Sequence, residues 1–134
     1  MDGGNKKYTV LVVEDDPQNL KFLKILLSKF FNVIACSSES EFYRTVVHHQ
    51  FDAVLMDITL SGNKSGLSLI KSLRQIPLYK NIPIICLSAH IAEADKLEAL
   101  KAGANLYLRK PVQNKILIES IESEIRKGLT KNFN

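Results

Sequence analysis

Five short apolar runs, each followed by a segment with the apolar spacing of a helix, restrict the fold of this chain more than any other feature. The runs cover residues 10–13, 32–36, 53–56, 83–87 and 106–108. Their apolar residues do not alternate with polar ones, a pattern typical of parallel strands covered on both faces. Repetition of this strand–helix unit predicts an α/β domain with a five-stranded parallel sheet, right-handed crossovers and helices on both faces.

Several predicted helices begin or end at residues suited to that place. Asp16 and Pro17 favour the start of the first helix, because aspartate caps free N–H groups and proline fits the first turn. Ser38 or Ser40 is a candidate cap for the second helix. Gly103 suits the position just after the fourth helix, where the backbone often turns left-handed.

The chain length fits one domain. Its 134 residues can bury a core that folds without disulfides or structural metal. We expect this domain over residues 8–127, with flexible ends at residues 1–7 and 128–134.

The two cysteines, Cys36 and Cys86, lie in apolar runs and lack the spacing of a metal site, which indicates buried, reduced thiols.

Charge and hydropathy argue against several classes of function. The net charge of +4 comes from basic residues scattered along the chain, which indicates solvated helix faces rather than a nucleic-acid surface. The first residues lack the apolar stretch of a signal peptide, and no apolar run approaches the ~20 residues that cross a bilayer. We therefore expect a cytoplasmic protein without direct DNA binding or membrane insertion.

Polar side chains follow the apolar runs at one edge of the predicted sheet. These side chains are Glu14, Asp15, Asp57, Ser88 and Lys110. The carboxyl ends of parallel strands meet at this edge, where open α/β sheets bind ligands. Three carboxylates repel one another there unless a cation shares the site, and oxygen ligands favour Mg²⁺ over zinc. Together with a hydroxyl donor and a fixed ammonium, the cluster suits acceptance of a phosphoryl group on a carboxylate.

Four strings in this order, LVVEDDPQN, VLMDITL, IICLSAH and LYLRKPV, resemble the receiver domains of two-component response regulators. The resemblance covers about residues 8–127 and includes the single-domain receivers of chemotaxis. It implies the flavodoxin-like, doubly wound fold with strand order 2-1-3-4-5 and five helices. It also implies a cis peptide before Pro111, a shape that would direct Lys110 into the site.

The resemblance implies a metal-dependent phosphoacceptor. Asp57 is the residue expected to be phosphorylated, from a histidine kinase or a histidine phosphotransfer protein. Asp15, the Asp57 side chain and the backbone carbonyl of Thr59 would bind Mg²⁺ directly, and Glu14 would help through water.

The resemblance also implies catalytic and switch roles for residues of the last two strands. Ser88 and Lys110 would contact the phosphoryl group on Asp57, and Ser88 with Tyr107 would form a switch that changes a protein-binding surface. We expect a stand-alone phosphorelay receiver with a downstream protein target. It would assist only its own phosphorylation and dephosphorylation, and would not otherwise be an enzyme.

Two alternatives stay open beside the phosphoacceptor, and one stretch departs from the receiver pattern. The Met-Pro pair that usually follows the phosphorylated strand is absent from residues 60–66. An unphosphorylated interaction scaffold of the same fold would predict loss of Glu14, Asp15 or Lys110, and all three are present. An aspartate-nucleophile phosphatase is the weaker alternative, because Thr59 stands where such enzymes have an acidic residue, and threonine cannot supply the acid.

Overall fold

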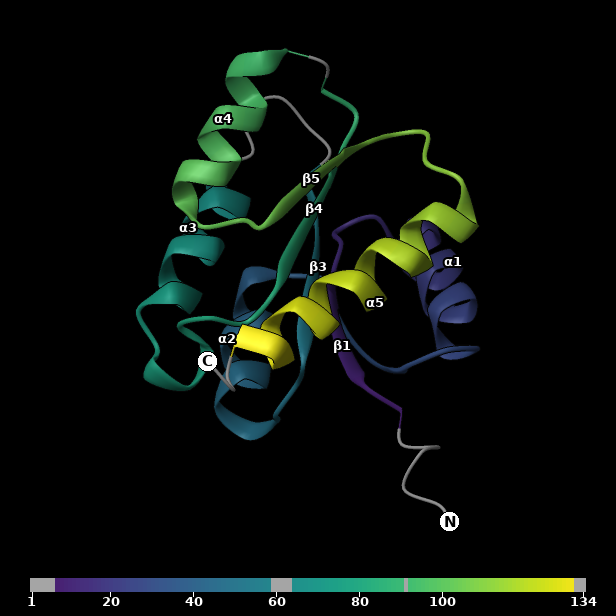
Figure 1. Ribbon diagram of the computed structural model, residues 1–134, viewed down its shortest axis with the longest axis horizontal. Helices are drawn as coiled ribbons and strands as arrows, with labels where there is room; N and C mark the ends of the chain where they lie inside the picture. Colours follow the sequence, from purple (N-terminus) through teal and green to yellow (C-terminus); the bar gives the residue numbers. More distant parts are fainter. Residues whose placement is uncertain (1–6, 59–63, 91, 132–134) are drawn as a thin grey trace.

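The computed structural model describes residues 7–58, 64–90 and 92–131. Figure 1 shows a central sheet with helices packed on both sides. Most of the expected flexible start, residues 1–6, and the end of the expected tail, residues 132–134, lie outside the described residues.

Strands and helices alternate along the chain as predicted. The strands are β1 (Thr9–Val13), β2 (Asn32–Cys36), β3 (Ala53–Ile58), β4 (Ile84–Ser88) and β5 (Leu106–Arg109). The helices are α1 (Pro17–Ser28), α2 (Glu39–His48), α3 (Lys64–Arg74), α4 (Glu93–Ala102) and α5 (Asn114–Lys131). A short 3-10 helix, η2 (Pro77–Tyr79), precedes β4 and was not predicted.

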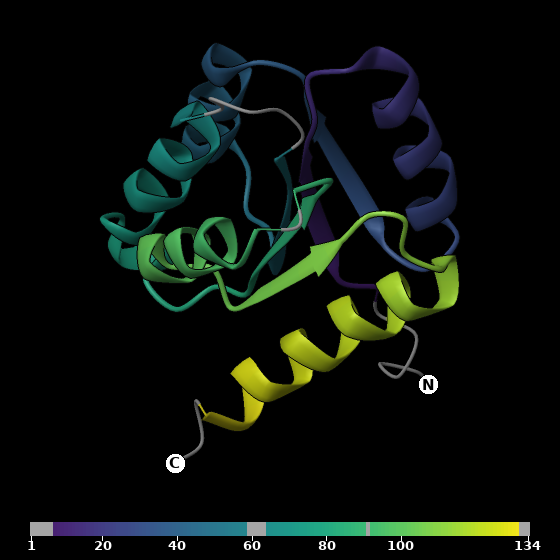
Figure 2. The ribbon, with the colours of Figure 1, turned by 90° about the horizontal axis from the view of Figure 1, so that it is seen from above.

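The strands form one parallel sheet in the order β2-β1-β3-β4-β5. This is the order of the flavodoxin-like fold, so the predicted fold class is confirmed. Figure 2 shows α1 and α5 on one face of the sheet and α2, α3 and α4 on the other. Because β1 and β3 separate β2 from β4, Cys36 and Cys86 lie apart, and both are free buried thiols in the described part of the chain.

The sheet divides the core into two layers, as the interior strand β1 shows. Val10 and Val12 pack with the apolar side chains of α1 and α5. Leu11 and Val13 point the other way and pack with those of α2, α3 and α4. This two-residue alternation between two apolar layers explains why the strand itself is apolar throughout.

Local signals place the helix ends as expected. The Asp16 carboxylate accepts a hydrogen bond from the Asn19 amide at 2.9 Å, and Pro17 is the first residue of α1. Ser38, rather than Ser40, caps α2. Gly103 follows α4 with a φ of 127°, which glycine adopts without strain.

Several elements extend further than predicted. Both β3 and β4 include the polar residues expected to follow them, because Asp57 pairs with Leu87 and Ile58 pairs with Ser88. The backbone pairing of these strands therefore extends past the apolar residues from which the strands were predicted. The last helix, α5, runs to Lys131, past the expected end of the domain at residue 127.

A single arginine joins several loops at the amino-terminal edge of the sheet. The Arg74 guanidinium donates hydrogen bonds to the backbone carbonyls of Gly103, Tyr79, Lys80 and Ile82. It also donates to Asn105 Oδ1 at 2.8 Å, and the same oxygen accepts from the Ile84 amide. Arg74 thus links α3 to the loops that begin β4 and β5.

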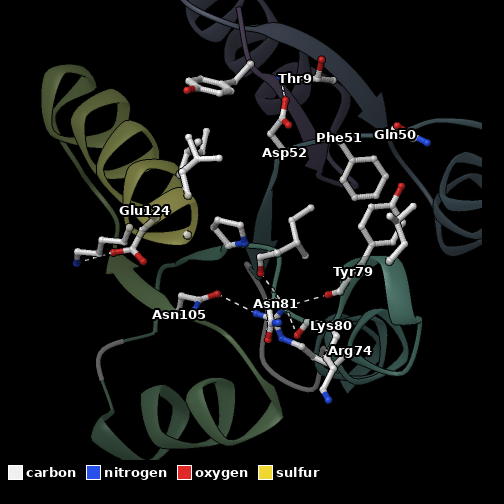
Figure 3. A pocket seen from close by; sticks show the side chains of 18 of the residues that line it. Thr9, Gln50, Phe51, Asp52, Arg74, Tyr79, Lys80, Asn81, Asn105 and Glu124 are labelled. Atoms are coloured by element: carbon white, nitrogen blue, oxygen red, sulfur yellow. Dashed lines mark hydrogen bonds and ion pairs between the residues drawn. The ribbon is translucent and has the colours of Figure 1, made fainter. Parts of the chain in front are cut away.

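A groove of about 1090 Å³ lies at this same edge. Figure 3 shows it between the starts of the strands, with Thr9, Asp52 and Asn105 among its lining residues. The predicted site is at the opposite, carboxyl-terminal edge, so this groove and the carboxylate cluster are separate features of the molecule.

We expect Arg74→Met to lower the free energy of unfolding by about 2–4 kcal/mol, because it leaves several buried carbonyls without a donor. Urea unfolding measures the change. Lys71→Met, at an exposed position of the same helix, is the control and should change stability by less than about 0.5 kcal/mol. Equal losses in the two variants would contradict this role for Arg74.

Candidate functional site

The carboxyl-terminal edge of the sheet holds a buried ion pair between β3 and the residue after β5. Lys110 Nζ lies 2.7 Å from each carboxylate oxygen of Asp57, and donates a hydrogen bond to Oδ2. The Asp57 side chain is 1% exposed and that of Lys110 is 26% exposed. The Lys110–Pro111 peptide is cis, as expected, and the Lys110 amide bonds to the Ser88 carbonyl.

Glu14, the residue after β1, is a second buried acid at this edge. Its side chain is 1% exposed, and Oε2 accepts a hydrogen bond from the Asp16 amide at 2.8 Å. Burial, and then contact with Asp57, raise the pKa of Glu14 to about 8. In metal-free protein near neutral pH, Glu14 therefore holds a proton next to the Asp57 carboxylate.

Two buried carboxylate oxygens of this site, Glu14 Oε1 and Asp57 Oδ1, accept no hydrogen bond from the described residues. Asp57 Oδ1 forms an ion pair with Lys110 Nζ at 2.7 Å, whereas Glu14 Oε1 has neither a hydrogen bond nor an ion pair with the described residues. A buried acceptor without a donor is unfavourable, and a cation can satisfy two such oxygens at once. The donor set, two hard oxygens beside a solvent-facing acid, fits a divalent cation such as Mg²⁺.

The other residues expected at the metal are Asp15 and Thr59. Asp15 is exposed and also contributes to the raised pKa of Glu14, so its carboxyl is near that of Glu14. Thr59 lies outside the described residues. No group of three or more His, Cys, Asp and Glu side chains is arranged to hold a metal within residues 7–58, 64–90 and 92–131. Of the three carboxylates expected at the metal, Glu14 and Asp57 lie together in the buried part of the site, and the exposed Asp15 lies beside Glu14.

Ser88 and Tyr107 lie beside the ion pair on β4 and β5. Ser88 is fully buried, and its Oγ accepts a hydrogen bond from the His90 amide at 3.0 Å. Tyr107 is 9% exposed, and its hydroxyl donates to the His90 carbonyl at 3.4 Å. The Tyr107 side chain is therefore largely buried, with its hydroxyl bonded to the loop after β4.

The sequence places His90 two residues after Ser88, at the rim of the site, either as a residue that affects water access to an acyl phosphate or as an exposed side chain. The backbone amide and carbonyl of His90 bond to Ser88 and Tyr107. A sequence pattern does not predict such contacts, because it is built on side chains. The His90 side chain lies near Asp95, with Nδ1 3.4 Å from Oδ2. The spacing of His90 two residues after the serine was visible, but nothing in it indicated these backbone contacts.

This arrangement suits chemistry at the Asp57 carboxylate. Lys110 holds one side of that carboxylate and supplies a positive charge close to any incoming anion. Ser88 lies on the neighbouring strand, in register with Ile58, and carries a hydroxyl. The site thus combines the buried Asp57 carboxylate, the Lys110 ammonium, the Ser88 hydroxyl and a second buried acid, Glu14, with an oxygen that accepts no hydrogen bond from the described residues.

We expect metal-free protein to lose stability as the pH rises from about 4.5 to about 8. The Glu14 pKa is about 8 in the fold against 4.5 for an unperturbed glutamate, so the folded state binds the extra proton in this interval. The contribution is fully present below pH ~4.5 and is lost toward pH ~8. Urea unfolding in EDTA across this range measures the slope.

Glu14→Gln should flatten that slope, since glutamine does not titrate. The matched control is Glu119→Gln at an exposed position of α5, which should keep the slope of the parent. If the stability of Glu14→Gln falls with rising pH as steeply as that of the parent, the prediction that Glu14 holds a proton in the fold is wrong.

Comparisons of the sequence and of the structure with known proteins identify the same family. The model of the response regulator receiver domain matches residues 10–122. A hybrid signal transduction histidine kinase I from Dictyostelium discoideum is 35% identical over 131 residues, which is 92% of this chain but 8% of that kinase. The chain thus spans a small part of this relative.

Solved structures agree with the sequence relatives. A response regulator from Thermotoga maritima is 27% identical, with a TM-score of 0.79 over 90% of this chain and 99% of that one. The receiver domain of the sensor histidine kinase PA1611 from Pseudomonas aeruginosa is 28% identical, with a TM-score of 0.78 over 90% of this chain and 98% of that one. That structure has a magnesium ion coordinated in its active site cleft.

None of the helices in the described part of the chain is long and apolar enough to cross a membrane. The family match covers most of the chain, and the strand order is that expected of the fold. The chain belongs to the response regulator receiver domain family of two-component signal transduction.

Proposed function

We propose that this chain accepts a phosphoryl group on Asp57 in a Mg²⁺-dependent step and stores it as an acyl phosphate. The observation that carries the proposal is the contact of Lys110 with the buried Asp57 carboxylate at 2.7 Å, beside the buried acid Glu14. A buried aspartate held by one lysine at a strand end is a nucleophile fixed in place. Family membership supplies the donor class, a phosphohistidine on a kinase or phosphotransfer protein.

Several residues would hold the metal. Glu14 Oε1 and Asp57 Oδ1 are buried and accept no hydrogen bond from the described residues, which supports a cation between them beside Lys110. Asp15 adds a carboxylate from the solvent side, and the Thr59 carbonyl is proposed from the receiver pattern alone. The magnesium ion in the Pseudomonas aeruginosa receiver supports the choice of metal. When bound, Mg²⁺ would supply positive charge to the oxygens of the transferred phosphoryl group.

Asp57, Lys110 and Ser88 would have different roles in the transfer of the phosphoryl group. An Asp57 oxygen attacks phosphorus, the new O–P bond forms, and the N–P bond to the donor histidine breaks. The electron pair of that bond returns to the imidazole, which takes up a proton from solvent or from the donor protein. Lys110 is already in place to neutralise charge on the phosphoryl oxygens, and the Ser88 hydroxyl donates to one of them.

A change of surface would follow from the same contacts. A phosphoryl group adds charge and acceptor oxygens next to Ser88, so the serine hydroxyl turns toward it. Because the His90 amide bonds to Ser88 Oγ and the His90 carbonyl bonds to Tyr107, this movement reaches β5 and the start of α4. We propose that a downstream protein reads this surface.

The scaffold alternative makes the opposite prediction at the site. A receiver that only binds partners needs no buried acid with unpartnered oxygens, and burying Glu14 and Asp57 together costs stability. The retention of both acids together with Lys110 supports phosphoryl chemistry over the scaffold. It does not favour the phosphatase, for which no acid stands at position 59.

Incubation with acetyl phosphate and Mg²⁺ should add the mass of one phosphoryl group to the parent and none to Asp57→Asn, measured by intact mass. With EDTA in place of Mg²⁺, we expect labelling to fall by at least about tenfold, because the carboxylates repel the donor without a cation. The matched control is Asp16→Asn, which removes a neighbouring acid and keeps a good helix cap. Labelling of Asp57→Asn to the level of Asp16→Asn would refute the assignment.

A further inference from the structure

The two most exposed large apolar side chains in the described part of the chain belong to one surface, formed by α2, α3 and η2. Val47, near the end of α2, is 77% exposed, and Leu78, in η2, is 66% exposed. Tyr43, one turn before Val47 on α2, is 40% exposed. We refer to these three side chains as the apolar stripe. Large apolar side chains that gather in solvent mark a surface that another molecule covers.

Contacts within the fold bring the apolar stripe together. The Tyr43 hydroxyl and Ser72 Oγ are 3.2 Å apart, which joins α2 to α3. Both helices return from the end of one parallel strand to the start of the next, so they run in the same direction, and Val47 lies level with the end of α3. The Tyr79 hydroxyl donates to the His49 carbonyl at 2.9 Å, which holds η2 beside the end of α2. The apolar stripe therefore follows the boundary between α2 and α3 as far as η2.

The chain on the α3 side of this stripe is basic. No aspartate or glutamate occurs in residues 58–92 of the sequence, whereas Lys64, Lys71, Arg74 and Lys80 all lie there. The charge of this stretch equals the formal net charge of the whole chain, +4. The Arg74 guanidinium bonds to backbone carbonyls, but Lys71 and Lys80 are exposed and form no ion pair with the described residues.

The acids of α2 lie at the start of that helix, before the apolar stripe. They are Glu39 and Glu41, and the Glu41 carboxylate accepts hydrogen bonds from the amide and the hydroxyl of Ser37. Further along α2 the next charge is that of Arg44, which is exposed. The apolar stripe thus has an exposed cation on each side, Arg44 from α2 and Lys71 from α3.

We propose that this surface binds an acidic amphipathic helix of a partner protein, with the apolar side of that helix on the apolar stripe and its carboxylates near Arg44 and Lys71. The inference goes beyond the proposed function and does not depend on it. It assigns a second interaction surface, away from Ser88 and Tyr107, which a partner can occupy whether or not Asp57 carries a phosphoryl group.

A helix fits this surface better than other occupants. Because α2 and α3 use their backbone groups within their own turns, they offer no strand edge, and a partner must bind through side chains. A helix presents apolar residues on one side at every third or fourth position, which matches a stripe that runs along two parallel helices. Nucleic acid would contact the cations and leave Val47 and Leu78 in water. A lipid surface requires a broader apolar face than these side chains provide.

The first arm of the test uses a pair of designed peptides of about 16 residues, long enough for a helix of four turns. Both carry leucine at every third or fourth position, and the remaining surface positions are glutamate in one peptide and lysine in the other. The acidic peptide should shift the amide NMR signals of residues 40–48, 68–75 and 77–80. It should bind with a Kd of about 1 mM or tighter, and the lysine peptide at least about tenfold more weakly. No binding of the acidic peptide, or shifts centred on another surface, overturns the inference.

The second arm removes the apolar contacts. Val47→Ser combined with Leu78→Ser should weaken binding of the acidic peptide by at least about tenfold, because two apolar side chains no longer leave water on binding. Both positions are exposed, so the fold should tolerate the changes. The matched control, Phe22→Ser combined with Ile25→Ser at exposed positions of α1, should change binding by less than about twofold. Equal weakening in the two double variants overturns the inference.

The third arm tests the charge of the partner. Lys71→Gln should weaken binding of the acidic peptide by about two- to fivefold at low salt, and by less at about 0.5 M NaCl, since salt screens exposed charges. Lys24→Gln, at an exposed position of α1, is the control and should bind like the parent. If Lys71→Gln and Lys24→Gln bind alike, the acidic character of the partner is wrong.

The last arm separates this surface from other ligands and from the phosphoryl response. If phosphatidylserine vesicles or a short DNA duplex shift the signals of α2 and α3 at lower concentration than the acidic peptide, the partner class is wrong. Beryllofluoride with Mg²⁺, a phosphoryl mimic, should leave the peptide affinity within about twofold, and a change of more than about fivefold overturns the independence of the surface. Asp57→Asn should bind the peptide like the parent, so a failure of the proposed phosphorylation leaves this test intact.

Discussion

Two adjacent buried acids, of which only Asp57 contacts an ammonium, are the constraint on which this structure depends. Glu14 and Asp57 end neighbouring strands of a parallel sheet, and Lys110 comes from the other side to contact Asp57. Burial, and then the contact with Asp57, raise the pKa of Glu14 to about 8, so metal-free protein near neutral pH holds a proton on Glu14. A bound cation would balance the Glu14 carboxylate instead of this proton.

The rest of the fold keeps these groups at one edge. The order β2-β1-β3-β4-β5 places the ends of β1 and β3 side by side and brings β4 and β5 next to Asp57. The two apolar layers hold the strands rigidly, so the acids cannot separate to lower their repulsion. At the opposite edge, Arg74 joins the loops that begin β4 and β5. The strands are therefore fixed at one end and carry chemistry at the other.

Much of this could be predicted from the sequence. The apolar runs determined the strands, Asp16 and Ser38 marked helix starts, and the polar residues after the runs indicated the site. The exact strand ends could not, because Asp57 and Ser88 are polar but remain paired in the sheet. The Arg74 contacts are with backbone carbonyls, which any sequence has, so only the folded chain shows which ones it meets. Likewise, the inward position of Tyr107 depends on a carbonyl of His90 rather than on a residue type.

Chemical trapping of the phosphorylated residue tests the central claim most directly. Borohydride reduces an acyl phosphate on aspartate to homoserine and leaves phosphate esters and free carboxylates unchanged. After phosphorylation with Mg²⁺, reduction and digestion, tandem mass spectrometry should find homoserine at position 57 and unmodified acids at positions 14 and 15. Homoserine at another position, or phosphate retained on a hydroxyl or histidine side chain, would contradict a phosphoacceptor built on the Asp57–Lys110 pair.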